Sequence, residues 1–329
     1  MAKRVKGWPT NVGSTRVVFL GGLGRSGSTL IERVLGELPG YCAAGELTHL
    51  WQWGILDDER CGCGDAFATC PFWAEVGHRA FGARGWTEAV ATRMLRLRAQ
   101  VDRMRHLPQL MAPTSAQVRA SELAAYLAGY RALYAAIAEV SGAEIVVDSS
   151  KHASMAFCLR HHAADLDFRL VHIVRDSRGV AYSWTKEMAR PQAAAGPHNT
   201  MARYSPVRAA LMWDADNASL DILGRLGTPR LLVRYEDFVA DPRGQVQRIA
   251  AFAGKPVTSS DLTFLGSTHA ELTGRHAIAG NPMRFQHGRV ELRRDDAWRS
   301  RLPRRQRQII SALTAPLLAR YGYPLGQPA

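Results

Sequence analysis

The sequence lacks any apolar stretch long enough to span a membrane. A transmembrane helix needs about 20 consecutive apolar residues, and no run in the 329 residues approaches that length. Residues 1–15 carry basic side chains but lack the apolar segment that follows such side chains in a signal peptide. These absences predict a globular protein without a transmembrane segment, and the cytoplasm as its location.

Acidic residues are few relative to basic ones. The chain has 42 Lys and Arg against 29 Asp and Glu, which gives a net charge of +13. This charge suits an anionic partner, such as nucleic acid, a membrane surface or a phosphorylated small molecule. The densest basic cluster, residues 299–307, precedes a helical apolar pattern and has no interleaved aromatic residues. We interpret it as a solvated helix start, with a phosphate-binding stripe as the alternative, and predict no nucleic-acid partner.

Cysteine is also scarce. Three of the five cysteines, Cys61, Cys63 and Cys70, fall within one short segment. Structural zinc sites usually show two paired CxxC-type elements or added histidines, and the spacing here shows neither. We therefore predict no metal. A compact loop that packs on Phe72 and Trp73 is the simpler interpretation, and an optional disulfide stays open.

Short apolar runs provide the main evidence for the fold. Residues 17–20, 145–147, 170–174 and 231–233 are typical of buried strands, and helical patterns alternate with them. This alternation predicts an α/β fold, a three-layer sandwich around a parallel central sheet. We predict one domain over residues 1–329 with a mostly helical cap insertion at about 55–142. The alternative is that the insertion only completes the core.

A glycine-rich turn, GGLGRSGS, links the first strand to an apolar helical pattern. It places Arg25, Ser26, Gly27, Ser28 and Thr29 at a helix N-terminus, where free amides and the helix dipole favour an anion. The segment nearly fits the pattern GxxxxGK[ST], but Ser28 stands where the lysine belongs. The sequence therefore predicts a P-loop-like phosphate-binding loop whose basic residue is Arg25.

With this loop, the sequence resembles the PAPS-dependent sulfotransferases, in which PAPS is 3′-phosphoadenosine 5′-phosphosulfate. Their loop reads PRSGTT or PKSGTT, and here it reads GRSGST. Their 3′-phosphate is held by an Arg at a strand end and a Ser eight residues later, matched by Arg175 and Ser183 in IVRDSRGVAYSW. Tyr235 begins a YED segment like the family's, and GNPMRF resembles a late loop of bacterial members that offers Arg284 to the donor.

The resemblance implies transfer of a sulfuryl group from PAPS to a hydroxyl, with release of 3′,5′-ADP. Negative charge then develops on the leaving phosphate, and we predict that Arg25, Lys151 and the amides of Ser28 and Thr29 stabilise it. Tyrosylprotein sulfotransferases place a glutamate shortly after the first helix in a GEE segment. The corresponding GEL segment here supplies Glu46 as the predicted base.

His152 is the alternative base. Sulfotransferases that act on phenols and steroids use a histidine in a KTH segment, and this chain reads SKH. Because His152 directly follows Lys151, the two side chains should point to opposite faces if the segment is extended. That geometry favours Glu46.

The acceptor is less well defined by the sequence. The Trp- and His-containing residues 49–53 and the insertion are predicted to line its pocket, which suggests a small molecule, a carbohydrate or a lipid. We expect turnover without a divalent metal, because the loop lacks the lysine that nucleotide triphosphatases combine with Mg²⁺. An ATP- or GTP-dependent phosphotransferase and a non-catalytic nucleotide or nucleic-acid binder remain alternatives. The sequence does not determine the oligomeric state.

Overall fold

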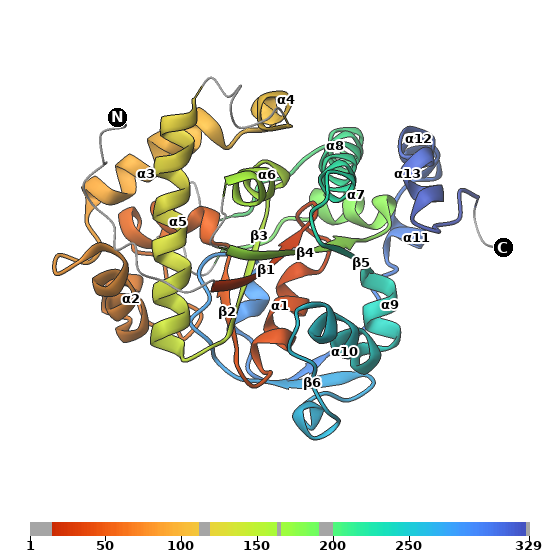
Figure 1. Ribbon diagram of the computed structural model, residues 1–329. Coiled ribbons are helices and arrows are strands. Elements are labelled where there is room, and N and C mark those ends of the chain that lie inside the picture. The colour runs from red at the N-terminus through yellow and green to blue at the C-terminus, as the bar shows by residue number, and fades with distance from the viewer. Residues whose placement is uncertain (1–14, 112–118, 163–165, 191–199, 327–329) are drawn as a thin grey trace.

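A parallel five-stranded sheet forms the centre of the computed structural model, which describes residues 15–111, 119–162, 166–190 and 200–326 (Figure 1). The strand order is β2–β3–β1–β4–β5, and every neighbouring pair runs parallel. The strands are β1 (Thr15–Gly21), β2 (Tyr41–Gly45), β3 (Ile145–Lys151), β4 (Leu166–Val174) and β5 (Arg230–Arg234). The predicted parallel sheet is confirmed, and among these strands only β2 is not indicated by an apolar run in the sequence.

Side chains along β1 alternate between two apolar cores, since successive residues of a strand point to opposite faces. Val17 and Phe19 belong to the core on one face, and Val18 and Leu20 belong to the core on the other. All four side chains are fully buried. A sheet that is buried on both faces needs a helical layer on each side, so the predicted three-layer arrangement is confirmed.

Helices cover both faces of the sheet (Figure 1). One layer contains α1 (Ser28–Gly36), α9 (Tyr235–Ala240) and α10 (Pro242–Phe252). The other contains α5 (Ala120–Ser141), α6 (Ala153–His162) and α8 (Pro206–Arg225). The remaining α-helices of the described residues are α2 (Pro71–Phe81), α3 (Glu88–Val101), α4 (Leu107–Met111), α7 (Ser177–Thr185), α11 (Trp298–Arg301), α12 (Arg304–Leu313) and α13 (Ala315–Arg320). None of the described helices is long and apolar enough to cross a membrane.

The chain between β2 and β3 contains α2 to α5 and packs against one face of the sheet. Its side chains share a single apolar core with β1, α6 and α8. The Tyr134 hydroxyl of α5 also donates a hydrogen bond to the buried Asp148 carboxylate of β3 (2.6 Å). The insertion thus forms part of a sheet layer, and a further role as a cap over the ligand-binding edge stays a prediction.

Loops converge at the carboxyl edge of the sheet, where open α/β folds bind ligands. The pairing register shifts between Phe19 and Gly21 of β1, and again between Ala43 and Gly45 of β2. A separate antiparallel hairpin, β6 (His269–Leu272) and β7 (Gly288–Glu291), sends its long connecting loop to this edge. There Ile278 bridges to Gly45, so the late loop forms a wall beside the end of β2.

Candidate active site

The glycine-rich turn ends directly at the N-terminus of α1. The first backbone hydrogen bond of α1 runs from the Leu30 amide to the Gly27 carbonyl (3.1 Å). Within the described residues, the amides of Ser28 and Thr29 therefore donate to no protein acceptor. Gly27 has a φ of 91°, and a β-carbon there would lie 2.3 Å from the Tyr235 ring. Only glycine fits this position, and the turn presents free amides as an anion site does.

Arg25 lies inside this loop, and two of its three guanidinium nitrogens have no hydrogen-bond partner among the described residues. Its Nη1 contacts the Met188 sulfur (3.1 Å), and the guanidinium carbon lies 5.2 Å from the centre of the Trp184 ring. The Nε and Nη2 atoms are buried and have no hydrogen-bond partner among the described residues. Burial lowers the pKa of Arg25, and attraction to Glu46 opposes this. Unpaired buried donors are costly, and an anion bound at this position would satisfy both of them.

Glu46 and Lys151 form an ion pair next to the loop. The Lys151 ammonium contacts the Glu46 carboxylate and donates a hydrogen bond to the Ser149 carbonyl (3.0 Å). A β-carbon built on Gly280 would lie 3.1 Å from Glu46 Oε1 and 3.6 Å from Thr29 Oγ1. The predicted base and Lys151, one of the predicted charge-stabilising groups, therefore meet at one edge of the sheet, with the Thr29 side chain nearby.

Glu32 lies beneath this pair and was not identified from the sequence. It belongs to α1 and is buried, accepting hydrogen bonds from the Gly45 amide (2.5 Å) and from the Ser149 hydroxyl (2.7 Å). Burial raises the pKa of Glu32 to about 7. Because Gly45 precedes Glu46 and Ser149 lies two residues before Lys151, Glu32 positions both strand ends.

The predicted nucleotide-binding residues meet on the other side of the loop. Arg175 follows β4 and donates to the Arg25 carbonyl (3.1 Å), and its guanidinium carbon lies 5.0 Å from the centre of the Tyr235 ring. The Asp295 carboxylate pairs with Arg175 (3.3 Å) and with Lys186 (3.3 Å). Sequence reasoning missed Asp295, although RRDD is a conspicuous charge cluster.

Ser183 lies in α7 and is buried. The indole of Trp184, its neighbour, donates to the Gly24 carbonyl (3.0 Å), which brings this end of α7 against the phosphate loop. A β-carbon on Gly24 would lie 2.9 Å from the Trp184 ring. This packing accounts for glycine at the position where the resembling family has proline.

Arg284 is turned into the protein. Its side chain is buried, and its guanidinium donates to the carbonyls of Ala279 and Arg60, the latter at 2.7 Å. Burial lowers the pKa of Arg284 to about 10. In this arrangement Arg284 holds the late loop against the start of the insertion. A direct contact with the donor stays a prediction.

Aromatic rings lie beside Glu46, in the region predicted to receive the acceptor. The rings of His49 and Trp53 stack with centres 3.8 Å apart, and the Arg190 guanidinium carbon lies 4.2 Å from the centre of the Trp53 ring. His49 Nε2 is 3.6 Å from the Glu46 carboxylate. His152, the alternative base, is exposed, and its ring meets His49 edge-on with centres 6.0 Å apart. Both histidines therefore lie near Glu46, and an experiment that tests Glu46 as the base must also test a histidine.

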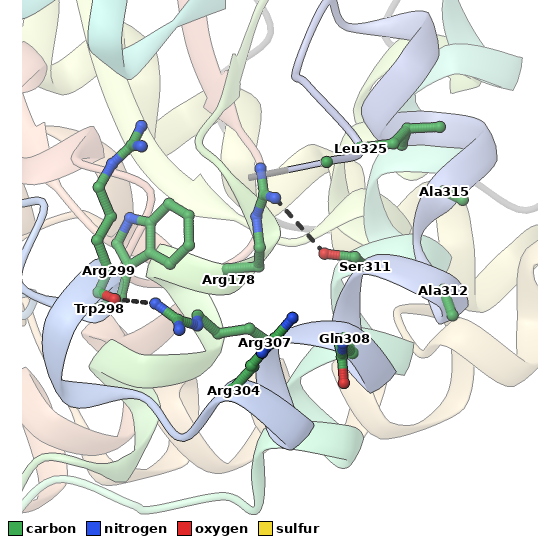
Figure 2. A pocket seen from close by; sticks show the side chains of 11 residues that line it. Arg178, Trp298, Arg299, Arg304, Arg307, Gln308, Ser311, Ala312, Ala315 and Leu325 are labelled. Carbon is green, nitrogen blue, oxygen red and sulfur yellow. Dashed lines mark hydrogen bonds between the residues drawn. The ribbon is translucent and has the colours of Figure 1, made fainter. Parts of the chain in front are cut away.

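A cavity of about 640 Å³ lies beside α7 (Figure 2). Arg178, Arg299, Arg304 and Arg307 line it, with Trp298 at its wall. A β-carbon on Gly179 would lie 3.2 Å from Trp298 and 3.4 Å from Arg175 Nε, so the indole lies between α7 and the cavity. No described phosphate-loop residue lines this space. Arg304 begins α12 and is exposed, whereas Arg299 and Arg307 are half-buried with buried Nε atoms.

Comparisons with known proteins relate this chain to sulfotransferases. Residues 17–259 match a family model described as the sulfotransferase family. A search of curated proteins gave no significant match. Among solved structures, the chain is similar to the sulfotransferase domain from the Synechococcus PCC 7002 olefin synthase, with 21% identity, coverage of 96% of this chain and 98% of that one, and a TM-score of 0.50. It is also similar to the sulfotransferase domain from the curacin biosynthetic pathway, with 15% identity, coverage of 96% and 100%, and a TM-score of 0.52. At these identities the structures support a shared fold.

Proposed function

Because this chain belongs to the sulfotransferase family, we propose that it transfers a sulfuryl group from PAPS to a hydroxyl of a small-molecule, carbohydrate or lipid acceptor, releasing 3′,5′-ADP. The observation that carries the proposal is the environment of Arg25. Two of its buried nitrogens have no partner within the described residues, and the same loop carries the free amides of Ser28 and Thr29. Such a cradle suits the 5′-phosphosulfate group.

In the proposed reaction, the acceptor oxygen attacks sulfur while Glu46 removes the hydroxyl proton. The bond between sulfur and the bridging oxygen breaks, and that oxygen leaves with the 5′-phosphate of 3′,5′-ADP. Arg25, Lys151 and the two loop amides stabilise the charge that develops there. On the far side of the loop, Arg175 and Ser183 hold the 3′-phosphate, and the Tyr235 ring supports the Arg175 guanidinium.

The aromatic rings of His49 and Trp53 form the acceptor side in this proposal. They stack next to Glu46, and the Arg190 guanidinium lies over the Trp53 ring. Burial lowers the pKa of His49 well below its ordinary value, and the nearby His152 adds to this effect. A neutral imidazole on an indole face suits a ring of a sugar, nucleoside or phenol, or the apolar part of a lipid, better than a polyanion.

Thermal stability in the presence of nucleotides tests the donor. A ligand that binds only the folded protein stabilises it by mass action, by about 2.7 kcal/mol at a concentration of 100 times its Kd. We expect 3′,5′-ADP to raise the Tm more than 5′-AMP does, and ATP with Mg²⁺ to have little effect. Stabilisation by ATP with Mg²⁺ and not by 3′,5′-ADP would instead support a phosphotransferase.

Mass spectrometry tests the reaction and the acceptor. The protein is incubated with PAPS and a panel of sugars, nucleosides, phenols and lipids, and products that have gained one SO₃ group are sought. The reaction should proceed without added Mg²⁺, because the loop lacks the lysine on which metal-assisted phosphoryl transfer depends. A rate that rises tenfold or more on addition of Mg²⁺ would contradict this part of the proposal.

A further inference from the structure

Three cysteines and one histidine point their ligand atoms at one small volume, remote in sequence from the phosphate loop. Cys61, Cys63 and Cys70 belong to the segment before α2, and His276 belongs to the late loop between β6 and β7. All four ligand atoms lie within 4.8 Å of one another. Cys70 and His276 are separated by 206 residues along the chain, so the fold alone creates this cluster.

The distances fit a tetrahedral metal site. Zinc binds thiolate sulfur at about 2.3 Å and imidazole nitrogen at about 2.0–2.1 Å, so neighbouring ligands should lie about 3.8 Å apart for two sulfurs and about 3.6 Å apart for sulfur and nitrogen. The Cys63 and Cys70 sulfurs are 3.8 Å apart. His276 Nδ1 lies 3.2 Å from the Cys70 sulfur and 3.9 Å from the Cys61 sulfur. A disulfide needs sulfurs about 2.05 Å apart, much closer than these.

The surrounding chain holds this geometry. Gly62 donates its amide to the Ala277 carbonyl (2.9 Å), and a β-carbon there would lie 2.4 Å from the Arg275 carbonyl oxygen. The ring of Phe72 stacks on His276 with centres 4.7 Å apart. These contacts fix the ligand loop against the late loop and orient the imidazole. The glycine between Cys61 and Cys63 is therefore explained by close packing of two backbones.

We propose that Cys61, Cys63, Cys70 and His276 bind a structural Zn²⁺ ion. Three soft thiolates and one imidazole select zinc over magnesium or calcium. Four protein ligands complete the tetrahedral shell and leave no position for substrate, which distinguishes a structural site from a catalytic one. The cysteine spacing alone predicts no metal, because the fourth ligand, His276, lies outside that segment.

The proposed metal site lies close to the loop that packs against the end of β2. Two residues after His276, Ile278 accepts a hydrogen bond from the Glu46 amide (2.8 Å) and donates one to the Ala44 carbonyl (3.0 Å). Bound zinc would fasten the beginning of the insertion to the loop that walls the end of β2. Metal binding of this kind contributes directly to folding stability. The proposal does not depend on the proposed function, because it concerns ligation and stability.

Metal analysis of the full-length chain tests the proposal. After incubation with zinc and removal of the excess, the protein should retain about one zinc per chain, and cobalt(II) in its place should show the intense absorption of tetrahedral thiolate ligation. His276→Gln and Cys70→Ser should bind zinc at least tenfold more weakly. Cys42→Ser is the matched control, because Cys42 is a free cysteine outside the cluster.

A chelator experiment on the wild-type protein covers the case in which a variant does not fold. Removing zinc with a strong chelator should lower the Tm, and zinc but not Mg²⁺ should restore it. Wild-type protein without retained zinc, a disulfide between Cys63 and Cys70 found by mass spectrometry, or His276→Gln with wild-type zinc affinity would each overturn the proposal. Because 3′,5′-ADP binding is measured separately, failure of the metal site and failure of the proposed function are distinguishable.

Discussion

The Lys151 ammonium pairs with the Glu46 carboxylate at the carboxyl edge of the sheet. Side-chain exposure is low for both, 12% for Lys151 and 13% for Glu46, so the pair is largely shielded from solvent. The lysine can balance the charge of the carboxylate before reaction and remain close when charge moves to the leaving oxygen. This one contact therefore connects the proposed base to the proposed stabiliser of the leaving group.

Glu46→Gln should lower kcat by about 10² or more, the usual scale of general base catalysis, because the amide keeps the shape but accepts no proton. Donor affinity should change little, since Glu46 lies on the proposed acceptor side of the loop. The measurement is steady-state kinetics with PAPS and an acceptor found by mass spectrometry, together with 3′,5′-ADP binding by calorimetry.

His152→Asn is the matched comparison for Glu46→Gln, because His152 is exposed and lies near the same site. We expect a much milder effect on kcat. An inactive His152→Asn variant beside a Glu46→Gln variant with most of its activity would transfer the role of base to His152. Equal and small effects of both substitutions would remove both residues from the proton transfer.

Arg175→Ala should weaken binding of 3′,5′-ADP by about 10- to 100-fold, the effect expected from roughly 1.5–3 kcal/mol for a charge-assisted hydrogen bond. Binding of 5′-AMP should change far less, because that ligand lacks the 3′-phosphate. Isothermal calorimetry of both ligands gives the comparison. Arg248→Ala removes an exposed arginine of α10 and controls for net charge. Similar losses for both ligands would refute the assignment of Arg175 to the 3′-phosphate.

Much of the fold could be predicted from the sequence because the information is local. The apolar runs of β1, β3, β4 and β5 identify buried strands without knowledge of their neighbours. Strand β2 was missed because YCAAG is built mainly from small residues and lacks β-branched ones. Its place in the sheet depends on pairing with β3, about a hundred residues later in the chain.

The site was predictable to the extent that its residues sit in short motifs. Arg25, Arg175 and Tyr235 follow strand ends, and parallel strands bring such positions to one edge. Glu32 was missed because an acidic residue on a helix normally faces solvent, and its burial depends on Ser149, 117 residues away. His276 was missed because the cysteine it contacts, Cys70, lies 206 residues earlier in the chain. Isolated residues gain a function here only through contacts that the fold creates.

Asp295→Asn should tighten binding of 3′,5′-ADP several-fold. The Asp295 carboxylate pairs with both Arg175 and Lys186, and a 3′-phosphate at Arg175 must compete with it and is repelled by its charge. Binding of 5′-AMP should be nearly unchanged. Calorimetry at two salt concentrations is the measurement, since repulsion between charges weakens as salt increases. Weaker binding in Asp295→Asn would show that the carboxylate supports the nucleotide site instead of competing for it.

Glu32→Gln should change the pH dependence of stability in a defined direction. Burial raises the pKa of Glu32 to about 7, above the ordinary value of 4.5. The folded chain therefore binds the Glu32 proton more tightly than the unfolded chain does, and this contribution to stability is fully present below pH 4.5. It is lost as the pH rises through 7, where the loss reaches on the order of 3 kcal/mol. Glutamine mimics the protonated carboxyl group and does not titrate, so its contribution to stability does not change with pH.

The free energy of unfolding, measured by urea denaturation at pH 4.5 and at pH 7.5, gives the test. The wild-type protein should lose more stability than Glu32→Gln between these two values. Asp148, whose pKa burial raises to about 6, and other buried carboxyl groups titrate in both proteins, so the difference between the two profiles isolates Glu32. Parallel profiles would mean that Glu32 is ionised throughout this range. In that case the hydrogen bonds from the Gly45 amide and the Ser149 hydroxyl, together with the charge of Lys151, outweigh the cost of burying the carboxylate.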